Sequence, residues 1–200
     1  MSDHVPAWLK KELPNAREGH ANLTIARMGS ADLLNKGGFS LKSAAFVNGE
    51  ELDPCFTAQE EDAVAPPLEW TPPPAGAQEL VLIVEDPDAP GDDALCHWVV
   101  WGLPPQKGQL LEGENPPRVG KNAQKNSEWL LPNPPAEDGP HDYVFQLFAI
   151  DLPLVLMPGA SRAQLHKEME GRIVAAAILT GTYQHQDDSE EVWEDDDDAL

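Results

Sequence analysis

Residues 80–90, Leu-Val-Leu-Ile-Val-Glu-Asp-Pro-Asp-Ala-Pro, are the stretch around which the chain is organised. The apolar run at 80–84 is rich in β-branched residues and is followed by turn residues, which predicts a strand buried on both faces. Pro87 has no amide hydrogen and disfavours helix at Asp86, so the strand should end there. The stretch therefore predicts a carboxylate at the rim of a rigid sheet.

Two other apolar runs begin with a histidine. His97 precedes a run at 98–101, and His141 precedes a run at 143–150. Alternation along a strand predicts that His97 and Trp98 point to opposite faces, and that His141 and Tyr143 share one face. If these runs are strands, the ends that carry Asp86, His97 and His141 could converge on one small polar site.

The ordered set of DPDAP (86–90), His97-Trp98 and the Pro-Pro…His-x-Tyr segment (134–143) resembles the phosphatidylethanolamine-binding protein family. The resemblance is greatest to its bacterial and archaeal, Raf-kinase-inhibitor-like branch, and it extends from about Phe39 to Tyr183. It implies a mainly β fold, a Greek-key antiparallel β-sandwich with peripheral helices. It also implies a ligand pocket without a cofactor, formed by Asp86, His97, Pro134, Pro135, His141 and Tyr143.

The residue types in this pocket suit a small anion or a phosphorylated head group. A carboxylate such as Asp86 can accept a hydrogen bond from one histidine, which orients the ring and favours its imidazolium form. Asp86 could instead accept from the ammonium of ethanolamine. Asp88 is expected to bond nearby amides. We predict that anion binding weakens as the pH rises above the histidine pKa.

Two positions depart from the family pattern. Asp142 stands where the family has the arginine of His-Arg-Tyr, and Ala65 stands where it has a serine. Loss of that cation should weaken anion affinity if the side chain at 142 faces the pocket.

The formal net charge of −22 restricts the partners. It repels phosphate backbones and anionic lipid surfaces at long range, so nucleic acid is not an expected partner. The first 20 residues lack an apolar leader segment, and no apolar run is long enough to span a membrane. With only Cys55 and Cys96, a cytoplasmic protein with reduced thiols is expected, although one disulfide between them is an alternative.

The expected organisation is an N-terminal extension (1–20), one domain (21–186) and a disordered acidic tail (187–200) that holds nine acidic residues. Ser161 and Gln164 fit a capping box that begins a helix over 161–176. Residues 106–135 show no sustained periodicity and are interpreted as a binding loop. Strands are expected at 23–28, 39–43, 80–86, 96–103, 143–150 and 178–183.

Three function classes stay open at this point. The first is a non-enzymatic module that binds a small anion or phosphorylated head group. The second is a kinase or protease inhibitor that acts through the pocket rim and the 106–135 loop, and the third is a hydrolase of low activity. Asp86, His97 and His141 could alternatively ligate Zn²⁺, whereas Cys96 should not pair with His97 because strand neighbours point apart. The resemblance also makes a homodimer plausible.

Overall fold

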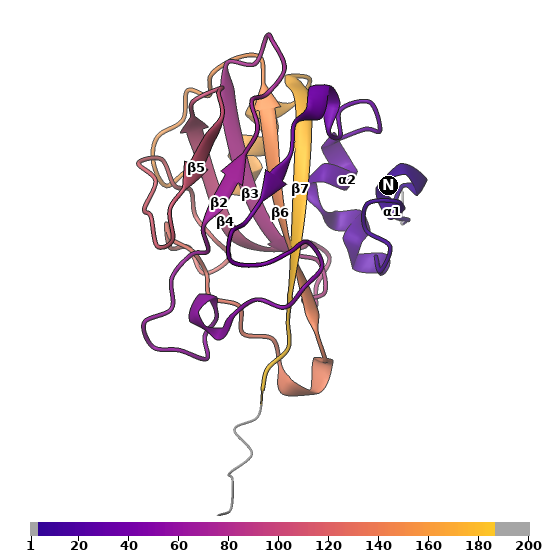
Figure 1. Cartoon of the computed structure of the whole chain (residues 1–200), viewed down its shortest axis with the longest axis vertical. Helices are drawn as coiled ribbons and strands as arrows, with labels where there is room; N and C mark the ends of the chain where they lie inside the picture. Colours follow the sequence, from indigo (N-terminus) through magenta and orange to yellow (C-terminus); the bar gives the residue numbers. More distant parts are fainter. Residues whose placement is uncertain (1–3, 187–200) are drawn as a thin grey trace, which may run out of the picture.

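The computed structural model describes residues 4–186, which form two antiparallel sheets packed against each other (Figure 1). The strands of the larger sheet lie in the order β4-β3-β6-β7, and those of the smaller sheet in the order β1-β2-β5. After β4 the chain crosses to the smaller sheet as β5 and returns as β6 beside β3, which gives the expected Greek-key sandwich. The larger sheet holds β3 (Glu79–Asp86), β4 (Leu95–Leu103), β6 (His141–Ile150) and β7 (Ile173–Tyr183), and the smaller holds β1 (Leu41–Lys42), β2 (Leu68–Trp70) and β5 (Gly108–Leu110).

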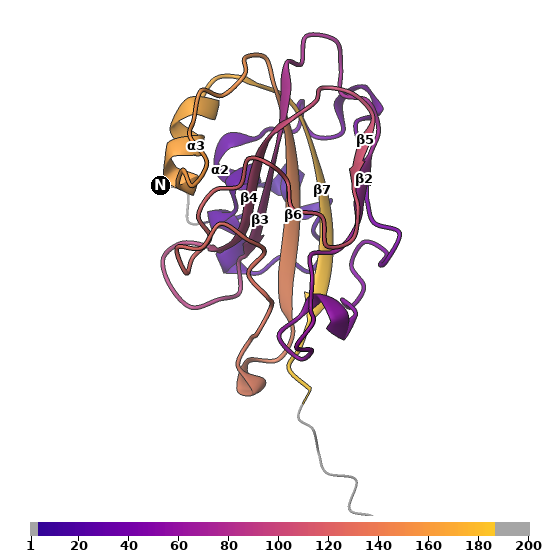
Figure 2. The same cartoon turned by 90° about the vertical axis from the view of Figure 1, so that its left-hand side faces the viewer.

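The larger sheet separates two hydrophobic cores. Leu80, Leu82 and Val84 face the smaller sheet, whereas Val81 and Ile83 face a layer of helices. Residues 80–84 are all fully buried, so the prediction of a strand covered on both faces is confirmed. Figure 2 shows this arrangement, with α2 and α3 on one side of the sheet and β2 and β5 on the other.

The helical layer differs from the sequence prediction at two places. Residues 23–28 were expected to be a strand, but Thr24–Met28 form a short helix, α2. A run of six residues is too short for alternation alone to separate the two structures. The helix expected over 161–176 has the predicted capping box at Ser161, but α3 ends at Met169 and the chain turns at Gly171, where φ is +71°. The last strand therefore begins at residue 173 rather than 178.

The N-terminal part of the described chain, from Val5 to Leu13, packs on the body of the protein. Helix α1 (Ala7–Lys10) places Leu9 in the core between the larger sheet and the helices, which we call the second core. Val5 and Leu13 lie in the same core. Short 3₁₀ turns complete the chain, at Glu18–Asn22 (η1), Lys36–Gly38 (η2), Pro54–Phe56 (η3) and Ala136–Asp138 (η4). Between residues 4 and 186, no helix is long and apolar enough to cross a membrane. The acidic tail predicted at 187–200 lies outside the described residues.

Candidate functional site

The end of β3 and the beginnings of β4 and β6 meet at one end of the larger sheet. In this antiparallel sheet, Asp86 pairs with the first residue of β4, and Glu85 lies opposite Val144 of β6. The side chains of Asp86, His97, His141 and Tyr143 come together there, and each residue is at most 3% exposed. Four of the predicted site residues thus share one enclosed polar region.

Asp86 is held in place and in turn holds His141. One of its oxygens, Oδ1, accepts hydrogen bonds from the amides of Asp88 (2.8 Å) and Ala89 (3.1 Å). The other, Oδ2, lies 2.7 Å from Nδ1 of His141. This hydrogen bond raises the pKa of His141 above its ordinary value, and the charges of Asp88 and Asp138 act in the same direction. The expected histidine–carboxylate pair is present in the structure.

The pKa of His97 is shifted in the opposite direction to that of His141. The Nδ1 atom of His97 lies 2.7 Å from the carbonyl oxygen of Leu130, so Nδ1 must carry the proton and donate it. Burial lowers the pKa of His97 and so favours the neutral ring, in which Nε2 carries a lone pair and can accept a hydrogen bond. This Nε2 is buried and has no hydrogen-bond partner among the described residues. An unsatisfied buried polar atom is uncommon in proteins and marks a place where a ligand or water is expected.

A β-bulge aims His97 at the site. Val84 pairs with Trp98, and the next residue of β3, Glu85, pairs with Cys96. His97 is therefore an extra residue of β4 that has no pairing partner on β3. The rings of His97 and Trp98 both contact Trp129, with centroids 6.1 and 5.8 Å apart. The prediction that they point to opposite faces is wrong, because the bulge interrupts the alternation.

Of two residues near His97, Tyr143 contacts its ring and Cys96 points into the core on the other face of the sheet. The Tyr143 ring meets the His97 ring edge-on at 5.1 Å, and burial raises the pKa of its hydroxyl. Cys96 lies in the second core, as expected of a residue that does not pair with His97, and burial raises the pKa of its thiol to about 12. Cys96 and Cys55 are both free thiols.

Pro134 and Pro135 lead into a turn beneath the start of β6. Pro134 is buried, and Pro135 is the exposed residue that precedes η4. Figure 1 shows this turn at the lower end of the sheet. From η4, the Oδ2 atom of Asp138 lies 3.4 Å from Nε2 of His141. Both nitrogens of His141 therefore face carboxylates, one from Asp86 and one from Asp138. Sequence reasoning missed Asp138, although it precedes His141 by only three residues.

The N-terminal segment reaches the same region. Arg17 donates from Nε and Nη2 to the two carboxylate oxygens of Asp88. The second of these oxygens also accepts from the amide of Asp142, 2.8 Å away. The Asp142 carboxylate lies 2.8 Å from Nε2 of the buried His20 and 3.3 Å from Arg17. The cation that the resemblance places at 142 is absent, but Arg17 places another cation beside it.

His20, Asp88 and Asp142 have ligand atoms close enough together to hold a metal ion. Their hydrogen bonds argue against this use. The amide of Arg17 donates to Nδ1 of His20, so Nε2 carries the proton that is donated to Asp142. The guanidinium of Arg17 already forms ion pairs with both carboxylates. The cluster is therefore best described as a structural ion-pair network that ties residues 17–20 to the ends of β3 and β6.

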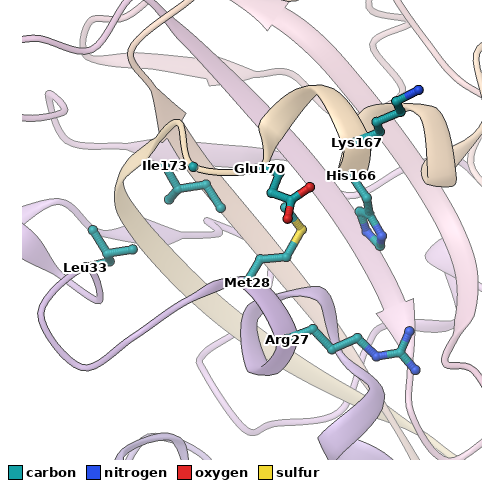
Figure 3. A pocket seen from close by; sticks show the side chains of 8 residues that line it. Arg27, Met28, Leu33, His166, Lys167, Glu170 and Ile173 are labelled. Carbon is teal, nitrogen blue, oxygen red and sulfur yellow. The ribbon is translucent and has the colours of Figure 1, made fainter. Parts of the chain in front are cut away.

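Other hollows lie outside this region. One, of about 540 Å³, lies between α2 and α3 on the helix-covered face of the larger sheet and is shown in Figure 3. Met28, Leu33 and Ile173 contribute its apolar part, and His166 and Glu170 contribute polar groups. Two further cavities, of about 370 and 270 Å³, adjoin at Trp98, Asn115 and Glu128. The smaller of these two is also lined by Ala65 and Trp129, next to His97.

Comparison with known proteins shows which family the chain belongs to. The family model described as phosphatidylethanolamine-binding protein matches residues 42–184. The chain belongs to this family. The matched segment contains every predicted site residue, whereas Arg17 and His20 precede it.

Several relatives are bacterial or archaeal. A UPF0098 protein of Aquifex aeolicus is 36% identical over 160 residues, which cover 76% of this chain and 92% of the relative. The UPF0098 protein PH1269 of Pyrococcus horikoshii is 34% identical over 194 residues, covering 91% and 93%. The crystal structure of a phosphatidylethanolamine-binding protein homologue, CT736 of Chlamydia trachomatis, is 35% identical with a TM-score of 0.69, covering 74% of this chain and 98% of that one. These likenesses support the bacterial and archaeal branch of the family.

Proposed function

We propose that this protein is a non-enzymatic binding protein for a small anion such as inorganic phosphate or a phosphorylated head group. Its binding residues are Asp86, His97, His141 and Tyr143. The observation that carries the proposal is the buried Nε2 of His97, which has no hydrogen-bond partner among the described residues, beside the His141 ring that Asp86 orients. A protonated phosphate oxygen can donate to that lone pair, or the ring can take up a proton and donate to the anion.

A phosphorus NMR or calorimetric titration with phosphate and with phosphoethanolamine tests this function. His141→Ala should weaken binding by about tenfold or more, because it removes a charge-assisted hydrogen-bond donor. His4→Ala is the matched control, because it removes an exposed histidine that is far from His141 in the sequence. This variant should bind as the wild type does. Titrations in low and high salt separate the local site from the repulsive net charge. No saturable binding to the wild type under either condition would refute the proposal.

Inhibition of a kinase or protease is the second candidate function. The two adjoining cavities at Trp98, Asn115 and Glu128 favour it, because residues 113–131 of the predicted binding loop line much of their surface. In this case Asn115→Trp should abolish capture of a partner enzyme while phosphate binding is retained. A hydrolase would instead require turnover of phosphoesters or peptides that is lost in Asp86→Ala.

We also propose a cytoplasmic location and a homodimer. The free thiols of Cys55 and Cys96 are compatible with a reducing compartment. A related mycobacterial protein, LppC, is named as a lipoprotein and is 36% identical over 149 residues, so cell fractionation is the relevant test of location. Light scattering across a concentration series tests the dimer.

A further inference from the structure

We propose that Asp138 is a built-in competitor for the anion, because its carboxylate occupies the hydrogen-bonding direction of His141 that a bound anion would use. This inference rests on the proposed function, since it concerns the same pocket. It adds a residue that determines how tightly the pocket binds, and which no motif in the sequence indicates.

The geometry of His141 leaves one direction for a ligand. The Nδ1 atom is bonded to Asp86, which is itself fixed by the amides of Asp88 and Ala89. An anion can therefore approach only Nε2. Asp138 now stands at that atom, at 3.4 Å, which is an ion-pair distance but longer than a good charge-assisted hydrogen bond.

The contrast between the two carboxylates supports this interpretation. The Asp86 side chain is 3% exposed and bonded by both oxygens, whereas that of Asp138 is 36% exposed. Asp138 lies at the end of η4, whose three residues are all exposed. Gly139 follows with φ +74°, and a Cβ built on it would meet nothing within 4 Å. Asp138 can thus be displaced by a small movement of an exposed turn, while Asp86 cannot.

The negative charges around His141 limit how tightly an anion can bind even after Asp138 is displaced. Asp86, Asp88 and Asp138 all raise the pKa of His141. An incoming anion must separate Asp138 from His141 and then remain near its negative charge. Removing this one negative charge should weaken the contact that competes for Nε2 and also reduce the local repulsion of an anion.

The test compares Asp138→Asn with Glu137→Gln. Glu137 lies in the same exposed turn, and its loss removes the same charge without removing a contact to His141. Inorganic sulfate is the probe, because it stays doubly charged over the whole working pH range. We expect Asp138→Asn to bind sulfate about tenfold more tightly than the wild type, the order of one charge-assisted hydrogen bond, and Glu137→Gln to change the affinity less than about threefold.

The pKa of His141, measured by NMR without ligand, provides a second readout. It should fall in Asp138→Asn, because one of the groups that raises it is gone, and stay near the wild-type value in Glu137→Gln. If the wild type binds sulfate and Asp138→Asn binds it no more tightly than Glu137→Gln, the inference is wrong and the anion-binding function stands. If no variant binds sulfate, the inference is wrong, whatever the pKa of His141, and the phosphate titration of the wild type decides separately whether the anion-binding function stands.

Discussion

The carboxylate of Asp86 and the imidazole of His141 form a buried pair, 2.7 Å apart, although 55 positions separate them in the chain. Each lies at the end of a strand, and the pairing of β3 with β6 brings the two ends together. Two backbone amides fix the carboxylate from the other side. The protonation state of His141 is therefore coupled to the fold as well as to any bound anion.

This coupling predicts how stability depends on pH. The pKa of His141 is raised in the folded protein, so the pair stabilises the fold fully below the unfolded pKa of about 6.5. That stabilisation is lost as the pH rises through the folded pKa. Urea unfolding of the wild type and His141→Gln should thus show a gap in the free energy of unfolding that narrows from pH 5 to pH 9. A gap of constant size would contradict the assignment.

Sulfate binding should follow the protonation of His97. In the unliganded protein burial lowers the pKa of His97, and sulfate has no proton to offer to the lone pair on Nε2. Binding therefore requires His97 to take up a proton, and the affinity should fall steadily between pH 5.5 and pH 8. Calorimetry in buffers of different ionisation enthalpy would detect the proton uptake directly. Affinity that does not change over this range would exclude the mechanism.

Arg17 should influence the site from outside the segment matched by the family model. Arg17→Lys keeps the cation but cannot reproduce the two-pronged contact with Asp88. We expect sulfate binding to weaken by about threefold to tenfold, since the adjoining Asp86 and His141 lose part of their support. Arg27→Lys is the control, because Arg27 pairs with the exposed Asp93.

A substitution at Gly19 tests the effect of the N-terminal segment on the site without altering a charged side chain. A Cβ on Gly19 would overlap the carbonyl oxygen of Pro87, directly after Asp86. Gly19→Ala should therefore displace the turn and weaken sulfate binding in the same direction as Arg17→Lys. Folded variants of both kinds with wild-type affinity would show that the N-terminal segment has no effect on the site.

Arg162 is predicted to matter for stability through a buried carboxylate. The fully buried Glu85 accepts hydrogen bonds from Arg162, from the amide and hydroxyl of Thr24, and from Gln146. Arg162→Met should cost about 2–3 kcal/mol in urea unfolding, because a charged acceptor loses its cation in the interior. Arg27→Met removes an exposed pair and should cost less than about 1 kcal/mol. Equal losses would show that Glu85 does not depend on Arg162.

The strands that the sequence predicts well are those with continuous apolar runs. Residues 80–84 could be assigned because every side chain is apolar, and the helix start at Ser161 could be assigned because its capping box is local. The end of α3 was harder, since Ile173 and Ala176 continue the helical spacing, and the chain turns only because Gly171 adopts a left-handed conformation. Local pattern alone could not reveal that turn.

The residues of the candidate site also differ in how well the sequence predicts them. Asp86, His97, His141 and Tyr143 could be identified because each is attached to a strand end or a motif. The roles of Arg17, His20 and Asp138 depend on tertiary contacts from turns, which carry no periodic signal. The orientation of His97 could not be predicted because the bulge exists only in the pairing of β3 with β4.

The hydrogen bonds at the start of α2 have a consequence for the order of folding. This helix has only five residues, no side-chain cap of its own, and a length at which isolated helices are unstable. The amides of Thr24 and Ile25 bond instead to the side chains of Glu85 and Gln146, which stand on neighbouring strands. Helix α2 should consequently form only after β3 and β6 have paired, so its amides should gain protection from hydrogen exchange later in refolding than those of the sheet.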